Sequence, residues 1–321
     1  MEQVLWQEQI LSYLPDPLQI CLQRRLDANE QELDWREIRL RVGVHPSVVT
    51  DRGDVWLEDC PPVSDEEIRL TLHRMSHGSY YTLEQELQQA FLTLPGGHRV
   101  GLAGSMIFQE GQVQGLRRIA SLNIRIARQN PGAASDILPL IVPGEEVLNT
   151  LIFSPPAAGK TTMIRDLARW LAEPRQGAPH PRLKRSFRVG IVDERSEIAG
   201  CHQGIPQLDI GRKSDVLDHC PKAAGIQLLL RSLNPEVIIA DEVGRREDVE
   251  AIREALRCGV SIITTAHAGS RQQLLSRPWL RDLIQDGMFQ RFVQLSPHPT
   301  PGQVEGVWDA DGISLAPATW N

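Results

Sequence analysis

The chain has 321 residues, which is enough for two domains of ordinary size. Its formal net charge of −7 at pH 7 argues against electrostatic binding of nucleic acid by the molecule as a whole. No apolar run approaches the roughly 18 residues of a membrane-spanning helix, and residues 1–14 lack the basic side chains of a signal peptide. We therefore expect a cytoplasmic protein that could act at a membrane only through a partner.

Cysteines are scattered along the chain and form no C-x-x-C pair. The five positions are Cys21, Cys60, Cys201, Cys220 and Cys258. An odd number at irregular spacing does not indicate a disulfide framework. We expect reduced thiols, as in a cytosolic protein.

Residues 1–145 are expected to form a smaller α/β domain, because helical and strand periodicities alternate along them. The third predicted helix begins after Ser64, which forms a capping box with Glu67. Helices are predicted at 3–14, 17–26, 65–76 and 82–90, and strands at 38–42, 48–49, 55–57, 91–94, 98–102 and 122–126. A turn pair at Pro143-Gly144 marks the boundary with a second domain, 146–321.

The second domain opens with a candidate phosphate-binding loop. An apolar strand at 147–153 leads into the loop and an amphipathic helix follows it, so that backbone N–H groups and the helix N-terminus can face a polyphosphate. Lys160 would reach the β- and γ-phosphates of ATP, and the Thr161 hydroxyl would bind Mg²⁺. The loop consists of Ser154, Pro155, Pro156, Ala157, Ala158, Gly159, Lys160, Thr161 and Thr162.

This loop departs from the usual Walker A pattern, G-x-x-x-x-G-K-[ST]. Ser154 replaces the first glycine and Ala157 lies in the middle, so Gly159 is the only glycine of the loop. The backbone freedom of the loop is reduced as a result. The departure therefore puts the affinity for ATP in question.

The rest of the second domain alternates strand and helix, which predicts a parallel sheet with right-handed crossovers. The basic, proline-broken stretch 173–186 is predicted to be a surface loop, and the irregular stretch 200–218 a functional loop. Strands are predicted at 187–192, 237–240, 260–264 and 292–295, and helices at 222–232, 247–258 and 271–286. A hairpin that turns at Asp311-Gly312 ends the chain.

Two carboxylates, Asp241 and Glu242, follow the apolar strand 237–240. Acidic residues at the carboxyl end of a parallel strand would lie beside the phosphate loop, where ligands of open α/β sheets bind. Asp241 could hold the Mg²⁺ shell through water, and Glu242 could polarise the attacking water. The loop and the acidic strand end together predict an ATPase.

Two other predicted strands also end in polar residues that should reach this sheet edge. Asp193 and Glu194 follow 187–192, and Thr265 and His267 follow 260–264. His267 could contact the γ-phosphate region and report hydrolysis to the next subunit. The alternative is a histidine that is simply hydrogen-bonded in a loop.

Several arginines could stabilise charge during phosphoryl transfer, although each alone is more often a surface charge. Arg231 ends a predicted helix, and Arg212 lies within the loop 200–218. Arg125 and Arg128 end the last strand of the first domain. An arginine of this kind commonly comes from a neighbouring subunit.

Four stretches resemble the motif boxes of secretion and pilus-assembly ATPases: 193–200, 231–238, 241–245 and 265–268. Two more, 95–104 and 121–128, bring the resemblance closer to the stage III sporulation protein AA family of endospore-forming bacteria, over most of the chain. The resemblance implies a RecA/AAA-like P-loop ATPase domain after a secretion-ATPase N-terminal domain.

The same resemblance implies a cytoplasmic ATPase that forms a ring, expected to be a hexamer, and powers a secretion-like channel at the membranes around the forespore. Its partners would be copies of itself and membrane-embedded channel components. The N-terminal domain would pack over the nucleotide and supply basic side chains, which makes Arg125 and Arg128 the first candidates for the arginine that acts across subunits.

Three acidic residues compete for the role of the base that activates water. Secretion ATPases place a glutamate in the acidic box, which favours Asp193 or Glu194. An ordinary AAA site uses the residue after the acidic strand, which is Glu242. We favour Glu242 because it directly follows Asp241, but the sequence leaves the choice open.

Two other functions fit the sequence. The chain could be a nucleotide-gated scaffold that binds ATP to assemble and hydrolyses little, in keeping with the glycine-poor loop. It could also be an ATPase that handles nucleic acid through the basic loop 173–186, which the acidic net charge disfavours.

Overall fold

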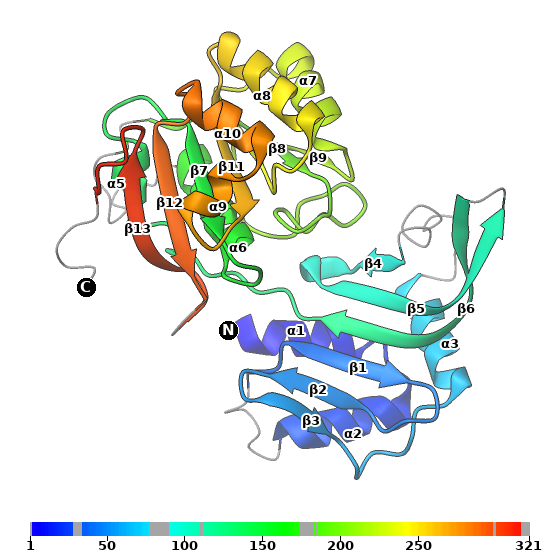
Figure 1. Ribbon diagram of the computed structural model, residues 1–321. Coiled ribbons are helices and arrows are strands. Elements are labelled where there is room, and N and C mark those ends of the chain that lie inside the picture. The colour runs from blue at the N-terminus through cyan, green and yellow to red at the C-terminus, as the bar shows by residue number, and fades with distance from the viewer. Residues whose placement is uncertain are drawn as a thin grey trace. The chain divides into compact units, whose positions relative to one another are not determined.

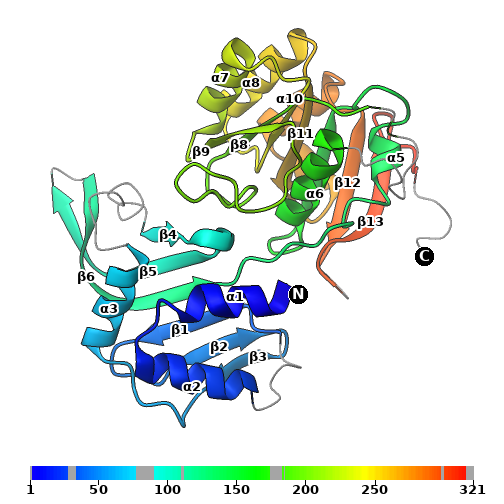
Figure 2. The same cartoon turned by 180° about the vertical axis from the view of Figure 1, so that it is seen from behind.

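The computed structural model describes residues 2–27, 34–76, 90–109, 112–173, 183, 185–297 and 300–315. Contacts between Cα atoms divide the chain into two compact units, each with a sheet of its own (Figures 1 and 2). The first unit consists of Met1–Arg128 and Gly200–Gln207, and the second of Gln129–Ala199 and Leu208–Asn321. The predicted α/β class is confirmed.

Within the described residues, the first unit has an antiparallel sheet of six strands in the order β3-β2-β1-β6-β5-β4. The strands are β1 (Glu37–Arg41), β2 (Ser47–Thr50), β3 (Gly53–Trp56), β4 (Phe91–Thr93), β5 (Arg99–Gln109) and β6 (Gln112–Arg125). In β1, Ile38 and Leu40 are buried and their neighbours are half-buried, as the alternation predicts.

Helices of the first unit share one hydrophobic core with this sheet. Leu18 and Leu22 of α2 and Ile68 of α3 are buried in the same cluster as the apolar side chains of β1. The helices are α1 (Glu2–Leu11), α2 (Asp16–Asp27) and α3 (Asp65–Met75), and the 3-10 turn η3 (Pro95–Gly97) joins β4 to β5. The helix predicted at 82–90 lies outside the described residues, apart from residue 90.

The predicted capping box is present at the start of α3. The Ser64 hydroxyl accepts the backbone N–H of Glu67 at 3.2 Å, and the Glu67 carboxylate accepts the backbone N–H of Ser64 at 2.7 Å. Two backbone donors that a helix N-terminus would leave unpaired are thereby satisfied.

Residues 200–207 belong to the first unit although they follow strand β8 (Val189–Asp193) of the second unit in the chain. The Gln207 side-chain oxygen accepts the backbone N–H of Gly96 at 3.0 Å. The ring Nδ1 of His202 lies 2.8 Å from the carbonyl oxygen of Thr93. These contacts with β4 and the turn after it account for the assignment.

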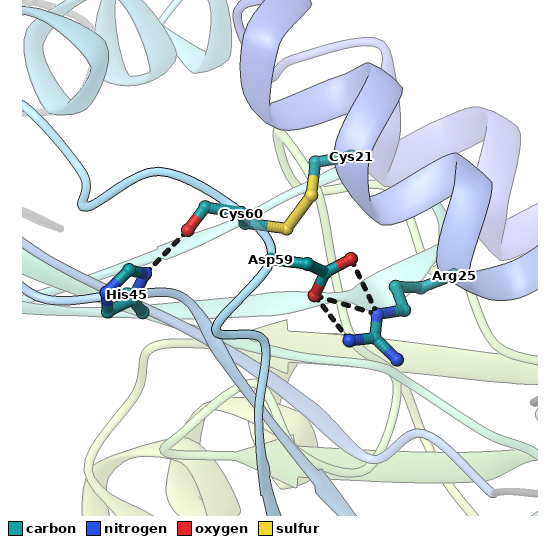
Figure 3. The surroundings of a disulfide bond; sticks show 5 residues. All are labelled: Cys21, Arg25, His45, Asp59 and Cys60. Atoms are coloured by element: carbon teal, nitrogen blue, oxygen red, sulfur yellow. Dashed lines mark hydrogen bonds and ion pairs between the residues drawn. A yellow bond between two sulfur atoms is a disulfide. The ribbon is translucent and has the colours of Figure 1, made fainter.

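Cys21 and Cys60 form a disulfide, so the prediction that all cysteines are reduced is wrong for this pair (Figure 3). Cys21 lies in α2 and Cys60 follows β3, with a Cα–Cα distance of 5.8 Å that suits a bridge. Beside the bridge, Arg25 binds the carboxylate of Asp59. The packing of α2 brings together two cysteines 39 residues apart, which their spacing along the chain does not reveal.

The second unit has, within the described residues, a seven-stranded sheet in the order β13-β12-β7-β11-β10-β8-β9. All neighbours pair in parallel except β12 and β13, so the predicted parallel sheet is confirmed. The strands are β7 (Thr150–Ser154), β8 (Val189–Asp193), β9 (Ser214–Asp218), β10 (Val237–Ala240), β11 (Ser261–His267), β12 (Arg291–Ser296) and β13 (Gln303–Asp309).

Helices cover both faces of this sheet: α6 lies on one face, and α7, α8 and α10 lie on the other (Figures 1 and 2). Strand β10 is buried along its whole length, as its continuous apolar run predicts. The helices are α5 (Leu138–Ile141), α6 (Lys160–Ala172), α7 (Lys222–Ser232), α8 (Arg246–Arg257), α9 (Arg271–Leu275) and α10 (Pro278–Gln285). No helix in the described parts of the chain is long and apolar enough to cross a membrane.

Residues 129–145 belong by their contacts to the second unit, whereas the sequence places the domain boundary near Pro143. The carboxylate of Asp166 in α6 accepts the backbone N–H groups of Gly132 and Ala134, at 3.0 and 2.8 Å. This carboxylate ties the stretch to the second unit.

Two further elements differ from prediction. Residues 214–218 form β9, which pairs with β8 at the sheet edge, so the predicted irregular loop is shorter than expected. The strand escapes prediction because it is mostly half-buried and contains only two apolar residues. The single helix predicted at 271–286 is wrong: α9 ends at Leu275 and α10 begins at Pro278, because a proline disfavours helical geometry in the residue before it.

Candidate functional site

The predicted phosphate loop joins β7 to α6. Gly159 caps α6 with a φ of 85°, a left-handed conformation that suits glycine. A Cβ at Gly159 would lie only 2.8 Å from backbone atoms of Gly302, whose N–H donates to the carbonyl of Ala158 at 3.0 Å. The loop therefore requires glycine at this position for both its conformation and its close backbone neighbour.

Ala157, in the middle of the loop, has a backbone conformation that normally favours glycine. Its φ of 58° is also left-handed, a conformation that costs an L-residue with a Cβ about 1–2 kcal/mol. The loop thus has alanine in a left-handed conformation, where glycine would be unstrained. The reduced backbone freedom that the sequence suggests corresponds to this strain.

Lys160 is buried beneath the loop, with 6% of its surface exposed. Its ammonium lies 3.1 Å from both the Ser154 hydroxyl and the Pro155 carbonyl oxygen, and 3.0 Å from Nδ1 of His267. Burial lowers the pKa of Lys160, and the nearby carboxylates of Asp241 and Glu242 oppose that shift. The lysine is therefore a positive charge held between the loop and the ends of β10 and β11.

Thr161 and Asp241 come together at the same point. The Thr161 hydroxyl donates to Oδ2 of Asp241 at 3.1 Å, although one residue lies in the first turn of α6 and the other follows β10. A hydroxyl and a carboxylate oxygen are ligands that Mg²⁺ accepts, usually with several waters retained. The donor set therefore fits a magnesium ion.

Glu242 follows Asp241 in a strained conformation, with a φ of 28°. Its backbone N–H donates to Oδ1 of Asp241 and to the hydroxyl of Thr265, each at 2.9 Å. Its side-chain Oε2 lies 3.3 Å from Nε2 of His267. His267 thus stands between the Lys160 ammonium on one ring nitrogen and the Glu242 carboxylate on the other.

Asp193 has a different kind of environment. It is 1% exposed, and its carboxylate accepts the backbone N–H groups of Glu197, Ile198 and Ala199 at 2.8, 3.0 and 2.9 Å. Burial raises the pKa of Asp193 from its ordinary 3.8 to about 6, against the effect of these hydrogen bonds. The carboxylate holds the turn that follows β8.

Glu194, the other candidate base of this strand end, forms an ion pair with Lys222 at the start of α7. Its side chain is 31% exposed. The structure therefore brings Lys160, Thr161, Asp241 and His267 to Glu242, and gives Asp193 and Glu194 partners of their own.

The described surroundings of each predicted arginine lie within its own unit. Arg231 is exposed in the last turn of α7, and Arg212 pairs with Glu173 at 3.0 Å. In the first unit, Arg125 lies 3.3 Å from the Glu37 carboxylate. Arg128 binds the Asp34 carboxylate and the carbonyl oxygen of Trp35.

Arg165 is a residue that sequence reasoning missed. From α6 it donates to the carbonyl oxygens of Ile198 and Glu197 at 2.6 and 2.5 Å, in the turn that Asp193 also holds. Burial lowers the pKa of Arg165, while Asp193, Asp241 and Glu197 raise it. In the sequence Arg165 stands beside the apolar face of a helix, so nothing distinguishes it from a surface charge.

Comparison with solved structures shows which known fold this chain shares. The fold is similar to that of the ATPase DotB from Legionella pneumophila, with a TM-score of 0.56 and 16% identity over 85% of this chain and 75% of that chain. It is also similar to the pilus retraction motor PilT, with a TM-score of 0.57 and 17% identity over 84% of this chain and 76% of that chain. The protein has the fold of secretion and pilus ATPases.

Sequence comparison narrows the class to one family. The chain is 43% identical over 311 residues to stage III sporulation protein AA of Bacillus subtilis (strain 168), which covers 97% of this chain and 98% of that protein. Residues 6–315 match the family "Sporulation stage III, protein AA". The chain belongs to this family, and the resemblance found in its sequence is confirmed.

The raised pKa of Asp193 predicts a pH dependence of stability. Because burial disfavours the charged form, the folded-state pKa of about 6 exceeds the ordinary value of 3.8. The contribution of Asp193 to stability is therefore fully present below about pH 4 and is lost as the pH rises through about 6. The melting temperature of the wild type minus that of Asp193→Asn should fall as the pH rises over this window.

Asp218 provides the control, because burial raises the pKa of that carboxylate too. In an Asp218→Asn background, the melting temperature with Asp193 minus that with Asp193→Asn should still fall as the pH rises, if Asp193 causes the fall. A difference in melting temperature that is constant from pH 4 to pH 7 would contradict the assignment.

Proposed function

We propose that this protein hydrolyses ATP in a Mg²⁺-dependent reaction at the site around Lys160. The observation that carries the proposal is the 3.1 Å contact between Thr161 Oγ1 and Asp241 Oδ2, because it joins the phosphate-loop helix to the acidic end of β10. These are the two halves of a phosphate and metal site. The structure of PilT, which has a similar fold, contains bound ADP and so supports a nucleotide as the ligand.

Each residue of the site has a separate task in the proposed reaction. Lys160 binds the β- and γ-phosphates, and Thr161 and Asp241 hold Mg²⁺, directly or through water. Bound Mg²⁺ neutralises phosphate charge. Glu242 orients the attacking water and accepts its proton, and His267, which lies between Lys160 and Glu242, responds to the γ-phosphate.

Glu242 is the base that the geometry favours. Its side chain is 39% exposed and its carboxylate lies 3.3 Å from His267 at the end of β11. Both carboxylate oxygens of Asp193 accept hydrogen bonds from backbone N–H groups, and Glu194 is paired with Lys222. A base must be able to reach the proton that it removes. The described partner of Glu242 is a histidine of the same site, whereas that of Glu194 is the lysine Lys222 at the start of α7.

We further propose that the protein acts as a homo-oligomeric ring of six subunits. The ring would work from the cytoplasm on membrane-embedded channel components of the sporulation apparatus. Family membership supports the role in sporulation, and the fold of secretion and pilus ATPases supports a motor. Light scattering with and without a non-hydrolysable ATP analogue measures the assembly, and a monomer under both conditions would contradict a ring.

In such a ring, an arginine from a neighbouring subunit would stabilise the transition-state charge, an effect worth about 10³-fold or more in rate. Arg125, Arg128 and Arg212 remain the candidates. Each now has a carboxylate partner within its own unit, Glu37, Asp34 and Glu173 respectively. An arginine that acts across the boundary would have to exchange this partner for the nucleotide.

The strained loop favours one alternative, a nucleotide-gated scaffold that binds ATP and hydrolyses it little. Ala157 adopts a left-handed conformation that is strained for alanine. A strained phosphate loop is consistent with a protein that binds ATP and turns it over slowly. A steady-state ATPase assay on the assembled protein separates a motor from a scaffold. The nucleic-acid alternative gains no support, because most of the stretch 173–186 lies outside the described residues.

The first prediction concerns Lys160. Lys160→Ala should weaken ATP binding about 10²-fold, because a hydrogen bond to a charged group is worth about 1.5–3 kcal/mol. Calorimetric titration measures this affinity, and Lys213→Ala, which removes an exposed lysine, is the matched control. Wild-type affinity in a folded Lys160→Ala protein would contradict the proposed site.

The second prediction identifies the base. Glu242→Gln should bind ATP as the wild type does and hydrolyse it about 10²-fold more slowly, since the amide cannot accept the proton. Glu194→Gln is the control and should reduce hydrolysis much less. If Glu194→Gln is inactive while Glu242→Gln turns over normally, the acidic box after β8 supplies the base instead.

A further inference from the structure

The backbone after β10 makes an unusual excursion. The ladder pairs Ala240 with Thr264 of β11, and the N–H of Val243 then returns to the carbonyl oxygen of Thr265 at 2.9 Å. Asp241 and Glu242 lie between these points, and Glu242 adopts the left-handed φ of 28°. A conformation of this kind costs a non-glycine residue on the order of 1–3 kcal/mol, so neighbouring groups must hold it in place.

One hydroxyl supplies much of that support. The Thr265 side chain donates to Oδ1 of Asp241 at 2.6 Å and accepts the backbone N–H of Glu242 at 2.9 Å. Thr265 is fully buried. In a buried site, losing either hydrogen bond would leave a polar group with fewer partners at a cost of about 1–3 kcal/mol.

Few side chains could do both tasks in this space. A hydroxyl has one donor and two acceptor lone pairs, so it can bind a carboxylate oxygen and an N–H together. Valine would fill the same volume but offer neither contact. Because the Thr265 hydroxyl binds Oδ1, the other carboxylate oxygen, Oδ2, is left to face Thr161 in the phosphate-loop helix.

We propose that Thr265 is a positioning residue for the reaction: it orients the Asp241 carboxylate toward Thr161 and holds Glu242 in the strained conformation that presents its side chain. The proposal rests on the proposed ATPase function. Thr265 acts through its two neighbours and makes no contact with the nucleotide in this scheme.

Thr264 offers a matched control one residue earlier in β11. It is also a fully buried threonine, and its hydroxyl makes one hydrogen bond, to the carbonyl oxygen of Ala240 at 2.8 Å. Thr264→Val therefore removes a buried hydroxyl from the same strand without touching Asp241 or Glu242. Thr265→Val loses two hydrogen bonds and Thr264→Val loses one, so Thr264→Val controls for the loss of a buried hydroxyl from this strand.

The test compares Thr265→Val, Thr265→Ser and Thr264→Val in steady-state hydrolysis and in ATP binding. Removing a group that orients a metal ligand typically costs 10–100-fold in activity or metal affinity. We expect Thr265→Val to lower kcat by about that factor and to need more Mg²⁺ for half-maximal rate, with ATP affinity within about threefold of the wild type. Thr265→Ser, which keeps the hydroxyl, should restore most of kcat, and Thr264→Val should retain it.

A second measurement does not depend on hydrolysis. Amide hydrogen exchange at Glu242 should be faster in Thr265→Val by about tenfold, and unchanged in Thr264→Val, because only the first variant removes an acceptor from this N–H. If the wild type does not hydrolyse ATP, the proposed function fails while exchange still decides the role of Thr265. A wild-type kcat and wild-type exchange in Thr265→Val, or equal losses in both valine variants, would overturn the proposal.

Discussion

The candidate site depends on two hydrogen bonds that the carboxylate of Asp241 accepts. Oδ2 accepts a hydrogen bond from Thr161 at the start of α6, and Oδ1 accepts one from Thr265 in β11. Strand β11 separates β10 from β7, the strand that feeds the phosphate loop. The two oxygens of Asp241 thereby link the start of α6 to the ends of β10 and β11. The charged groups of Lys160 and Glu242 lie beside this link.

The site concentrates features that lower stability. Lys160 is a buried cation, and both Ala157 and Glu242 adopt left-handed conformations. Strain of this kind persists where the surroundings over-determine the geometry. Here the support is a mostly parallel sheet whose inner strand β10 is buried at every residue and paired on both sides. A rigid scaffold can hold a buried cation and strained backbone conformations in a fixed geometry.

Much of the fold could be predicted because local patterns and tertiary packing agree. The alternation of apolar and polar residues predicts β1, and a continuous apolar run predicts β10. The Ser64 capping box predicts the start of α3. Predictions failed where the decisive contact is distant in sequence or the pattern is weak. The bridge between Cys21 and Cys60 depends on where α2 packs, and β9 has too few apolar residues to show a strand period.

The sequence by itself determined the residue types of the site and the elements that carry them, because the loop, the acidic strand end and the threonine-histidine strand end are local patterns. Only the tertiary structure separated Glu242 from Asp193, since both are carboxylates, one after the buried strand β10 and the other at the end of the buried strand β8. Backbone N–H groups occupy the oxygens of Asp193, while the Glu242 carboxylate lies beside His267. Burial and hydrogen-bond partners come from segments distant in the chain, and they decide which carboxylate oxygens are occupied by backbone N–H groups.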